Sequence, residues 1–347
     1  MKALRRLLVI GNAVLIFALF LGYIRQYIEP DYAGFLTIFS LLYPYIVVAL
    51  FITMLLLVAM RSRTAWASLL ALVLTSGNTI RQIGFHMQPE LPDDSTIYTL
   101  TTLNVKNNFS HNDVDQSKTF IQKFKNNPST FLVLQEIAGE KIHSIAQELN
   151  YPYHSHYGTS NPRGYLAIFS KFPLSNIQSV HNGENRVIAL LADVESPMGK
   201  IKLVNIHLHT NAVTVRAGQF SPESFSKKEG LRALHSMIQS YSQNARLRLE
   251  EIDQLHEALR KSNYPVIIAG DVNDTPYSPV YRKLQDNRQN AFVKGGLGFA
   301  QTYNGLLLPL KIDYIFMDKN FNIFHTLVEK IDFSDHNPIT TSFTIQN

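Results

Sequence analysis

Residues 265–276 read PVIIAGDVNDTP, and this stretch decides how the rest of the chain is interpreted. Residues 266–268 are β-branched, and the prolines and glycine around them are typical of a buried β-strand followed by a turn. Asp271 and Asn273 follow the strand two residues apart, so on an extended backbone both side chains point the same way. Taken alone, the fragment also fits an Asx turn that closes a strand, so its meaning depends on the other strand ends.

Between residues 97 and 347, short strand-like runs alternate with helix-like segments, which predicts one layered α/β domain. In such domains, ligands tend to bind where strands end. The polar residues at or just beyond predicted strand ends are Asn104, Glu136, His207, His209, Asp271, Asn273, Asp313, Asp335 and His336.

These side chains favour metal and acid/base chemistry on a phosphate ester. A carboxylate such as Glu136 at the end of a buried strand is costly if unpaired, so it requires a cation or hydrogen-bond donors. Carboxylate and amide oxygens suit Mg²⁺ or Mn²⁺ far better than zinc. His207 and His209 share one side of a strand, but no third zinc ligand of the usual type lies nearby. Histidines beside acids, as in Asp335-His336, suit general acid/base catalysis.

Composition narrows the choice of partners. The chain has 347 residues, 46% of them apolar, and no cysteine, which excludes disulfides, thiolate metal sites and a cysteine nucleophile. Of the net charge of +5, residues 1–90 contribute +4, from seven Lys and Arg against three Asp and Glu, so the remainder carries only +1. The high pI therefore reflects charge beside apolar segments and does not indicate a nucleic-acid binder.

The first ninety residues differ in composition from the rest and contain three long apolar runs, at residues 7–24, 33–60 and 65–80. A helix needs about 20 apolar residues to cross a ~30 Å hydrocarbon layer. No small-residue cleavage pattern follows the first run, and the second comes directly afterwards, which favours a membrane anchor over a signal peptide. We therefore expect a transmembrane region at 1–90 and a separate domain at 91–347.

Basic residues predict the orientation of this region. Lys2, Arg5 and Arg6 precede the first run and Arg61 and Arg63 follow the second, so both groups are expected in the cytoplasm. The third run is shorter and contains polar residues. With three spans, which we expect, the protein is a multi-pass protein of the inner cell membrane whose large domain lies outside the cytoplasm. With two spans that domain stays in the cytoplasm.

The motifs LNV, QE, HLH, GDVNDTP, KIDYIF and SDHNP occur in this order between residues 103 and 338. In order and spacing they resemble the endonuclease/exonuclease/phosphatase superfamily, the deoxyribonuclease I-like enzymes, over about residues 95–345. The resemblance implies a four-layered α/β sandwich of two facing mixed β-sheets flanked by helices. It also implies divalent-metal-dependent cleavage of phosphoester bonds, with Mg²⁺ or Mn²⁺ as the cofactor.

The resemblance implies metal-side roles for three residues. Glu136 corresponds to the principal metal ligand, with Asn104 beside it and Asp335 near the metal. Exonuclease III-type members carry an aspartate two residues after the first-strand asparagine, where this chain has Lys106. This departure weakens the case for apurinic-site nuclease activity, because a second metal-side carboxylate is missing.

Five further residues correspond to the phosphate side of the family's site. Asp271 would orient or deprotonate the attacking water, and Asn273 would hold a phosphate oxygen. His207 would stabilise charge on the phosphoryl group. Asp313 would fix the ring of His336, which would serve as general acid/base or hydrogen-bond donor. His209 corresponds to no family role.

The substrate remains open at the level of sequence. A nuclease needs many cations for backbone phosphates, and the large domain sums to only +1, although deoxyribonuclease I-like enzymes are not all strongly basic. A membrane anchor concentrates the enzyme on a lipid headgroup phosphoester, and it would equally hold a DNA or RNA nuclease at the cell surface. A small phosphate ester is a third class. A catalytically inactive, membrane-anchored binding domain is the alternative of a different kind.

Overall fold

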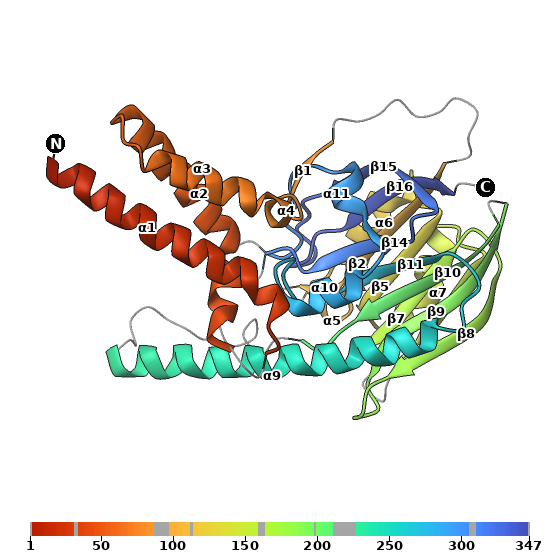
Figure 1. The fold of residues 1–347 in the computed structure, drawn as a ribbon. Coiled ribbons are helices and arrows are strands. Elements are labelled where there is room, and N and C mark those ends of the chain that lie inside the picture. The colour runs from red at the N-terminus through yellow and green to blue at the C-terminus, as the bar shows by residue number, and fades with distance from the viewer. Residues whose placement is uncertain are drawn as a thin grey trace. The chain divides into compact units, whose positions relative to one another are not determined.

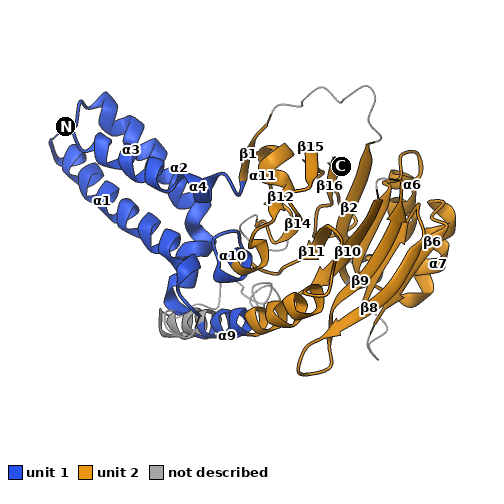
Figure 2. Cartoon of the chain, turned by 45° about the vertical axis from the view of Figure 1, so that its right-hand side comes forward, with its two compact units in different colours: residues 1–82, 211–246, 275–282 blue, residues 83–210, 247–274, 283–347 orange. Residues whose placement is uncertain are grey.

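The computed structural model describes residues 2–30, 34–86, 97–111, 114–158, 164–197, 199–210, 227–304 and 310–345 (Figure 1). The chain forms two compact units, shown in Figure 2. The helical unit comprises residues 1–82, 211–246 and 275–282, and the sandwich unit comprises residues 83–210, 247–274 and 283–347.

The helical unit is built from the apolar runs of the first eighty residues. Two helices, together with the short 3-10 turns beside them, are long and apolar enough to cross a membrane, over Lys2–Tyr27 and Gly34–Ala59. Helices of this kind occur as membrane anchors and as signal sequences. Its helices are α1 (Lys2–Ile24), η1 (Arg25–Tyr27), η2 (Gly34–Leu36), α2 (Thr37–Ala59), α3 (Ala65–Leu74) and α4 (Ser76–Thr79).

The third apolar run does not form the full-length span expected from the sequence. It is divided at Thr75 into α3, of ten residues, and the four-residue α4. Ten helical residues rise about 15 Å, roughly half of a ~30 Å hydrocarbon layer. Length alone therefore supports two spans among the described residues.

Buried polar contacts fix the direction of these helices within the unit. Ser68 on α3 donates to the Asn12 side chain on α1 at 2.6 Å, and Gln26, just after α1, donates to Asn78 on α4 at 3.1 Å. Because the lower number of one helix pairs with the lower number of the other, α3–α4 runs parallel to α1. The chain consequently leaves α4 beside the carboxyl-terminal end of α1.

The segment that follows the GDVND motif also belongs to the helical unit. Tyr277 is buried in the apolar cluster of α1–α3, where its ring centroid lies 4.2 Å from that of Tyr43. Its hydroxyl donates to Gln82, and Arg81 donates to the Pro276 carbonyl at 3.0 Å. These contacts group residues 275–282 with the first eighty-two residues, and the expected domain boundary at residue 90 stays a prediction.

The sandwich unit contains two six-stranded mixed sheets, and the predicted fold class is confirmed. One sheet has the order β15-β16-β2-β5-β7-β6 and the other β12-β14-β11-β10-β9-β8, with β2/β5 and β10/β11 as the parallel pairs. The strands of the first sheet are β15 (Phe321–Val328), β16 (Ile339–Ile345), β2 (Tyr98–Asn104), β5 (Phe131–Ile137), β7 (Tyr165–Ser170) and β6 (Tyr153–Tyr157). Those of the second are β12 (Gln289–Asn290), β14 (Asp313–Met317), β11 (Val266–Asp271), β10 (Gly199–His207), β9 (Val187–Ser196) and β8 (Leu174–His181).

Helices and short strands complete the unit. They are α5 (Lys106–Phe109), β3 (Ser110–His111), β4 (Val114–Asp115), α6 (Ser117–Lys125), α7 (Gly139–Glu148), α11 (Ala291–Gly295), and the two-stranded sheet of β1 (Ile83–Phe85) and β13 (Leu297–Phe299). Two further helices, α9 (Lys227–Leu259) and α10 (Pro279–Gln285), begin in the helical unit and end in the sandwich unit.

Strand β5 shows why these strands read as unbroken apolar runs. Phe131 and Val133 point into the core between the two sheets, whereas Leu132 and Leu134 point into the cluster formed with α6 and α7. Because successive side chains alternate between the two faces of a strand, a strand covered on both faces has no polar positions.

One buried asparagine joins the two sheets. Asn205 on β10 donates to the carbonyls of Leu134 and Ala167 on the opposite sheet at 2.8 and 2.9 Å, and it accepts from Gln135 at 2.7 Å. Asn205 is fully buried, so without it the two carbonyls would lose this donor and the Gln135 amide would keep only its bond to Thr102. This bridge holds β5 and β10 in register close to the ends that carry Glu136 and His207.

Asn205→Ala should lower the free energy of unfolding by about 3 kcal/mol, because three hydrogen bonds are lost in a buried site. Urea titration of the detergent-solubilised chain, followed by circular dichroism, measures the change. The matched control is Gln178→Ala on the exposed face of β8, which should change stability by less than about 0.5 kcal/mol. Equal effects of the two variants would show that the bridge is not structural.

Candidate active site

The site is assembled around the side-chain amide of Asn104, at the end of β2. Its Nδ2 donates to Glu136 Oε1 at 3.0 Å and to Asp271 Oδ2 at 3.1 Å. Glu136 belongs to the same sheet as Asn104, whereas Asp271 ends β11 of the opposite sheet. One amide thus brings a carboxylate from each sheet within hydrogen-bond distance of a single atom.

The backbone at Glu136 directs its side chain into this site. Glu136 has φ +58°, and the pairing of β5 with β7 shifts register between Leu134 and Ile137. A bulge of this kind turns a side chain out of its regular alternation, and a left-handed residue other than glycine costs about 1–3 kcal/mol. Such strain is typical of functional positions. The Glu136 side chain keeps 25% of its surface exposed, so a ligand can reach it.

The motif after β11 is an Asx turn as well as part of the site. The Asn273 amide donates to Asp271 Oδ1 at 2.8 Å, and Asn273 adopts φ +56°. Gly270 is required before it: its φ is +145°, and a Cβ there would lie 2.1 Å from the Ile206 carbonyl oxygen. The Asn273 side chain donates to the Leu208 carbonyl at 3.1 Å, which ties the turn to the end of β10.

Asp313 and His336 form the buried pair predicted from the sequence. His336 Nδ1 lies 3.1 and 3.0 Å from the two carboxylate oxygens of Asp313, and its Nε2 lies 3.9 Å from Asp271 Oδ2. Burial lowers the pKa of His336, but the carboxylates of Asp313 and Asp271 outweigh it and raise that pKa to about 10. The ring is therefore an imidazolium whose Nε2 faces Asp271.

The pKa of the Asp271 carboxyl is strongly raised. Burial and the neighbouring Asp313 carboxylate raise the pKa of Asp271 to about 7, although His336 and hydrogen bonds from Asn104 and Asn273 act in the opposite direction. A carboxylate with this pKa is a stronger base than an exposed aspartate. Its position between the imidazolium and the shared amide suits proton exchange with water.

His207 faces the same centre without a close partner. Its Nε2 is 3.7 Å from Glu136 Oε1 and 3.8 Å from Asp271 Oδ2, and within the described part of the chain this buried atom has no hydrogen-bond partner. Burial and then the charge of Arg186 outweigh Glu136 and lower the pKa of His207 to about 4. His207 is hence a neutral imidazole at pH 7, which still offers a hydrogen bond to a phosphate oxygen.

Lys106, which stands where exonuclease III-type members of the resembled family carry an aspartate, forms an ion pair in the structure. Lys106 Nζ lies 2.7 Å from Asp335 Oδ2, and Asp335 Oδ1 is buried without a hydrogen-bond partner among the described residues. Ser334 joins this loop to the centre, because its hydroxyl donates to the Asn104 carbonyl at 2.8 Å and accepts from the His336 amide at 3.1 Å. Lys106 therefore compensates a carboxylate that the sequence assigned to the metal.

His209 lies outside the cluster. Its backbone amide donates to Glu251 at 2.7 Å and its carbonyl accepts from Arg248 at 3.0 Å. Its side chain lines a separate cavity of about 150 Å³ with Glu184 and Glu250. The two histidines of the HLH motif thus have different surroundings and do not form a metal pair.

Sequence reasoning missed two neighbours of the histidines. Arg186 donates to the His207 carbonyl at 3.0 Å and to Glu251 at 3.3 Å, so it fixes the end of β10. The Tyr303 ring lies 4.9 Å from the His336 ring. Neither residue stands in a recognisable motif, and only the fold brings them to the site.

The donor set fits a hard divalent cation. Asp271, Asp313 and His336 offer ligand atoms within 4.8 Å of one another, but Asp313 and His336 are already hydrogen-bonded to each other. Glu136 and Asp271 supply carboxylate oxygens on either side of the Asn104 amide, and oxygen ligands are those that Mg²⁺ and Mn²⁺ prefer. The Asn104 oxygen accepts from the Lys106 amide at 2.9 Å, so its amide nitrogen is the group that faces the carboxylates.

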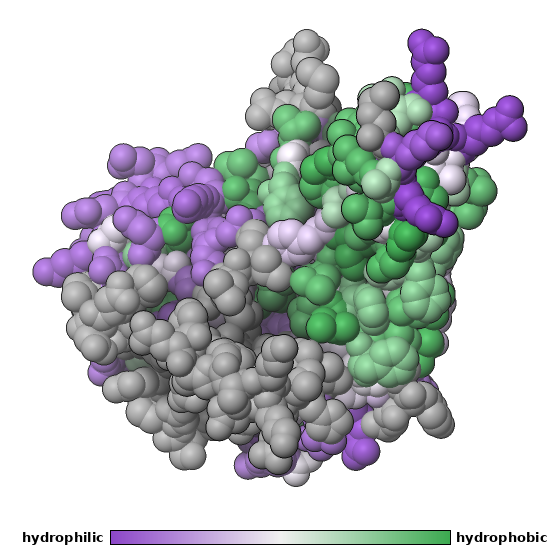
Figure 3. All heavy atoms as spheres, turned by 90° about the vertical axis from the view of Figure 1, so that its left-hand side faces the viewer, coloured by the Kyte–Doolittle hydropathy of each residue, from purple (hydrophilic) through white to green (hydrophobic). Residues whose placement is uncertain are grey.

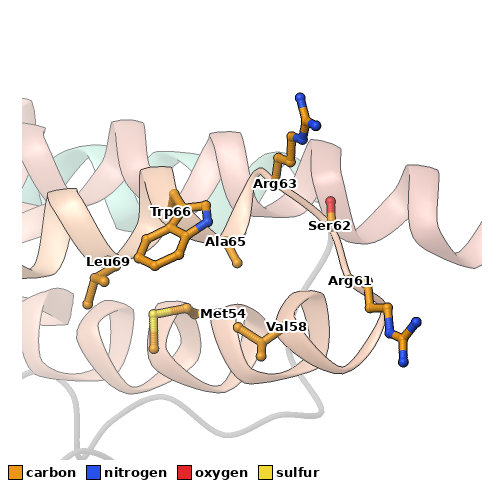
Figure 4. A pocket seen from close by; sticks show the side chains of 8 residues that line it. All are labelled: Met54, Val58, Arg61, Ser62, Arg63, Ala65, Trp66 and Leu69. Atoms are coloured by element: carbon orange, nitrogen blue, oxygen red, sulfur yellow. The ribbon is translucent and has the colours of Figure 1, made fainter.

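A larger pocket of about 430 Å³ lies elsewhere, between α2 and α3 of the helical unit (Figure 4). Met54, Val58 and Trp66 line it, with Arg61 and Arg63 at the turn between the helices. It contains none of the polar strand-end residues, so volume does not identify the site in this protein.

The sequence profile of the endonuclease/exonuclease/phosphatase family matches residues 101–336, which include the whole cluster. This chain belongs to that family. Its members are generally phosphoester hydrolases and typically use divalent metals. The profile of a domain of unknown function matches residues 5–82. No curated protein matches the chain.

Solved structures of the family share the fold of the sandwich unit. An endonuclease/exonuclease/phosphatase from Bacteroides vulgatus has 15% sequence identity and a TM-score of 0.55, with 73% of this chain and all of that one covered. One from Bacteroides thetaiotaomicron has 14% identity and a TM-score of 0.53, covering 73% and 99%. The human Nocturnin catalytic domain has 16% identity and a TM-score of 0.51, covering 72% and 94%. At these identities the likeness concerns the fold alone.

Asp313 and His336 should act as one unit, because the carboxylate holds the ring through Nδ1. His336→Ala should lower kcat/KM about 10²–10⁴-fold, the usual contribution of a positioned acid or base. The double variant with Asp313→Asn should be hardly slower than His336→Ala alone. Steady-state kinetics on a chromogenic phosphodiester measures this, with His143→Ala on α7 as the control. Additive losses would show independent roles, and a lowered melting temperature with normal turnover would reduce Asp313 to a structural residue.

Proposed function

We propose that this protein is a membrane-anchored, divalent-metal-dependent phosphoesterase that hydrolyses a phosphodiester or phosphomonoester by attack of an activated water. The observation that carries the proposal is the amide of Asn104, shared by Glu136 and Asp271 beside the Asp313–His336 pair. A binding domain has no need of a base, an imidazolium and a second, unpaired imidazole around one centre.

The chain's own residues divide the reaction between them. Asp271 accepts the proton of the attacking water, because its carboxylate is fixed by Asn104 and the Asn273 amide. The Nε2–H of His336 donates to the phosphoryl group, and Asp313 keeps that ring oriented. A divalent cation held by Glu136 would supply positive charge to the phosphate oxygens.

Two more groups contact the substrate in this proposal. His207 Nε2 has a hydrogen bond to give to a phosphate oxygen. Asn273, which follows Asp271 in the same turn, would hold a second phosphate oxygen. Lys106 neutralises Asp335, so the carboxylates available to a cation are few. This arrangement favours a single divalent ion, with Asp335 next to the metal rather than bound to a second one.

Membrane anchoring is supported by how little of the apolar helices is covered. In the most apolar 18-residue stretch of each helix, only 17% of the residues are buried within Lys2–Tyr27 and only 28% within Gly34–Ala59. A core helix of a soluble protein is mostly buried. Five large apolar side chains on these helices are each about half exposed or more: Leu7, Val14 and Phe17 on α1, and Phe51 and Leu55 on α2. Figure 3 shows exposed apolar side chains gathered on one side of the molecule. A hydrocarbon layer would cover them.

The bilayer also bears on the substrate class. An anchored enzyme meets phosphoesters in its own membrane at high effective concentration, and the sandwich lacks the excess of cations that a nucleic-acid backbone requires. We therefore propose a lipid headgroup phosphoester as the substrate class, ahead of a nuclease at the cell surface.

Metal removal should abolish hydrolysis. EDTA should eliminate turnover of a chromogenic phosphodiester and Mg²⁺ or Mn²⁺ should restore it. Glu136→Gln should raise the metal concentration needed for half-maximal activity by at least about tenfold, the smallest loss usual for a residue that supports a metal. Glu148→Gln, whose carboxylate pairs with Lys125 on the surface, is the matched control. Full activity in EDTA would remove the metal from the mechanism.

Although α3 alone is too short to span, we propose that α3 and α4 together return the chain across the membrane beside α1. The sandwich unit should then lie on the side of the membrane opposite the N-terminus. The pairs Asn12–Ser68 and Gln26–Asn78 support this proposal, because they bring the chain to the end of α1 before it leaves the helical unit. With Lys2, Arg5 and Arg6 in the cytoplasm, that side is extracytoplasmic.

Alkaline phosphatase fused after Asn347 should be active, and a reporter that fluoresces only in the cytoplasm should be dark. The reverse pattern would place the sandwich in the cytoplasm. The intact mass of the purified protein serves as the control, since cleavage after α1 would identify that helix as a signal sequence.

A further inference from the structure

A small apolar face lies where the chain enters the sandwich unit. In the two-stranded sheet of β1 and β13, Ile83 stands opposite Phe299 and Phe85 stands opposite Leu297. Opposite residues in an antiparallel pair share a face, and so do residues two apart on one strand. All four apolar side chains therefore lie on the same face of this sheet.

This face is exposed. Phe85 is 66% exposed, Leu297 64% and Phe299 45%. Gly84, between Ile83 and Phe85, points away from this face, and a Cβ there would meet the Gly296 carbonyl oxygen at 2.2 Å.

The length of chain between the units limits how far this face can lie from the end of α1. Gln26 donates to Asn78 at 3.1 Å, which fixes Asn78 beside that end, and the aromatic pair Tyr23–Tyr27 there is typical of a bilayer interface. From Asn78 to Ile83 there are five Cα–Cα steps, which span at most about 18 Å when extended. This limit holds for every arrangement of the two units.

We propose that Ile83, Phe85, Leu297 and Phe299 form a membrane-docking face, which enters the headgroup layer of the bilayer that holds the helical unit. The inference rests on the proposed membrane anchoring. Aromatic and aliphatic side chains favour the boundary between headgroups and acyl chains. The chain from Asn78 to Ile83 is short enough for the docking face to reach this boundary beside the end of α1. A second contact beside the anchor restrains the sandwich unit at the lipid surface, where a headgroup phosphoester would be presented to it.

The absence of cysteine makes a direct test simple. Phe85→Cys and Leu297→Cys, each labelled with an environment-sensitive fluorophore, are reconstituted as the full chain in phosphatidylcholine–phosphatidylglycerol vesicles. Lipids with a doxyl quencher near the headgroup should reduce the emission of both probes. The matched control is Ile177→Cys on β8, where Ile177 is 47% exposed. Strand β8 is the edge strand at the opposite end of its sheet from β12, so the emission of this probe should not be quenched.

Phe17→Cys on α1, at 66% exposure, reports anchoring separately, through quenchers placed deep in the acyl chains. Quenching of Phe17→Cys together with unquenched probes at 85 and 297 would overturn the docking face and leave the anchor intact. No quenching at any position would overturn both. If the fluorophore at residue 85 is shielded from solvent only at high protein density in the vesicles, and doxyl lipid has no effect on it, a second copy of this chain covers the apolar face. That result would equally overturn the proposal.

Discussion

The site depends on one hydrogen-bonding group, the amide of Asn104, which two carboxylates from different sheets share. Two anions this close repel each other unless donors or a cation stand between them, and the amide and the imidazolium of His336 meet part of this need. The proposed divalent ion would supply further positive charge. The bulge at Glu136 and the left-handed backbone at Gly270 and Asn273 carry the side chains to this point. The Asn205 bridge between the sheets keeps them there.

The parts of the fold that could be predicted from the sequence are those with local causes. Apolar and β-branched runs beside turn-forming residues predicted β2, β5 and β11, and the polar residues at their ends are Asn104, Glu136 and Asp271. The Asp313–His336 pair was predictable for another reason, because a carboxylate inside an apolar strand needs a cationic partner and the family pattern offers one. These residues do converge in the structure, and the roles assigned to them are the proposals tested above.

Non-local contacts could not be predicted in this way. Nothing in the LNVK stretch indicates that Lys106 reaches Asp335, and the neutral state of His207 follows from its burial near Arg186 rather than from its motif. The grouping of residues 275–282 with the apolar helices depends on Tyr277 packing against Tyr43, two residues far apart in the chain. The break after α3 falls at Thr75, whose carbonyl accepts a hydrogen bond at 3.2 Å from the hydroxyl of Tyr43 on α2.

The central claim is that Glu136 and Asp271, joined by Asn104, form a cation-dependent hydrolytic centre. Crystals of the protein soaked in Mn²⁺ and measured at the manganese absorption edge locate the ion directly. The account predicts one anomalous peak at a coordination distance of about 2.0–2.3 Å from a Glu136 carboxylate oxygen. A peak bound only by Asp271, Asp313 and His336, or no peak near Glu136 at saturating Mn²⁺, would contradict it.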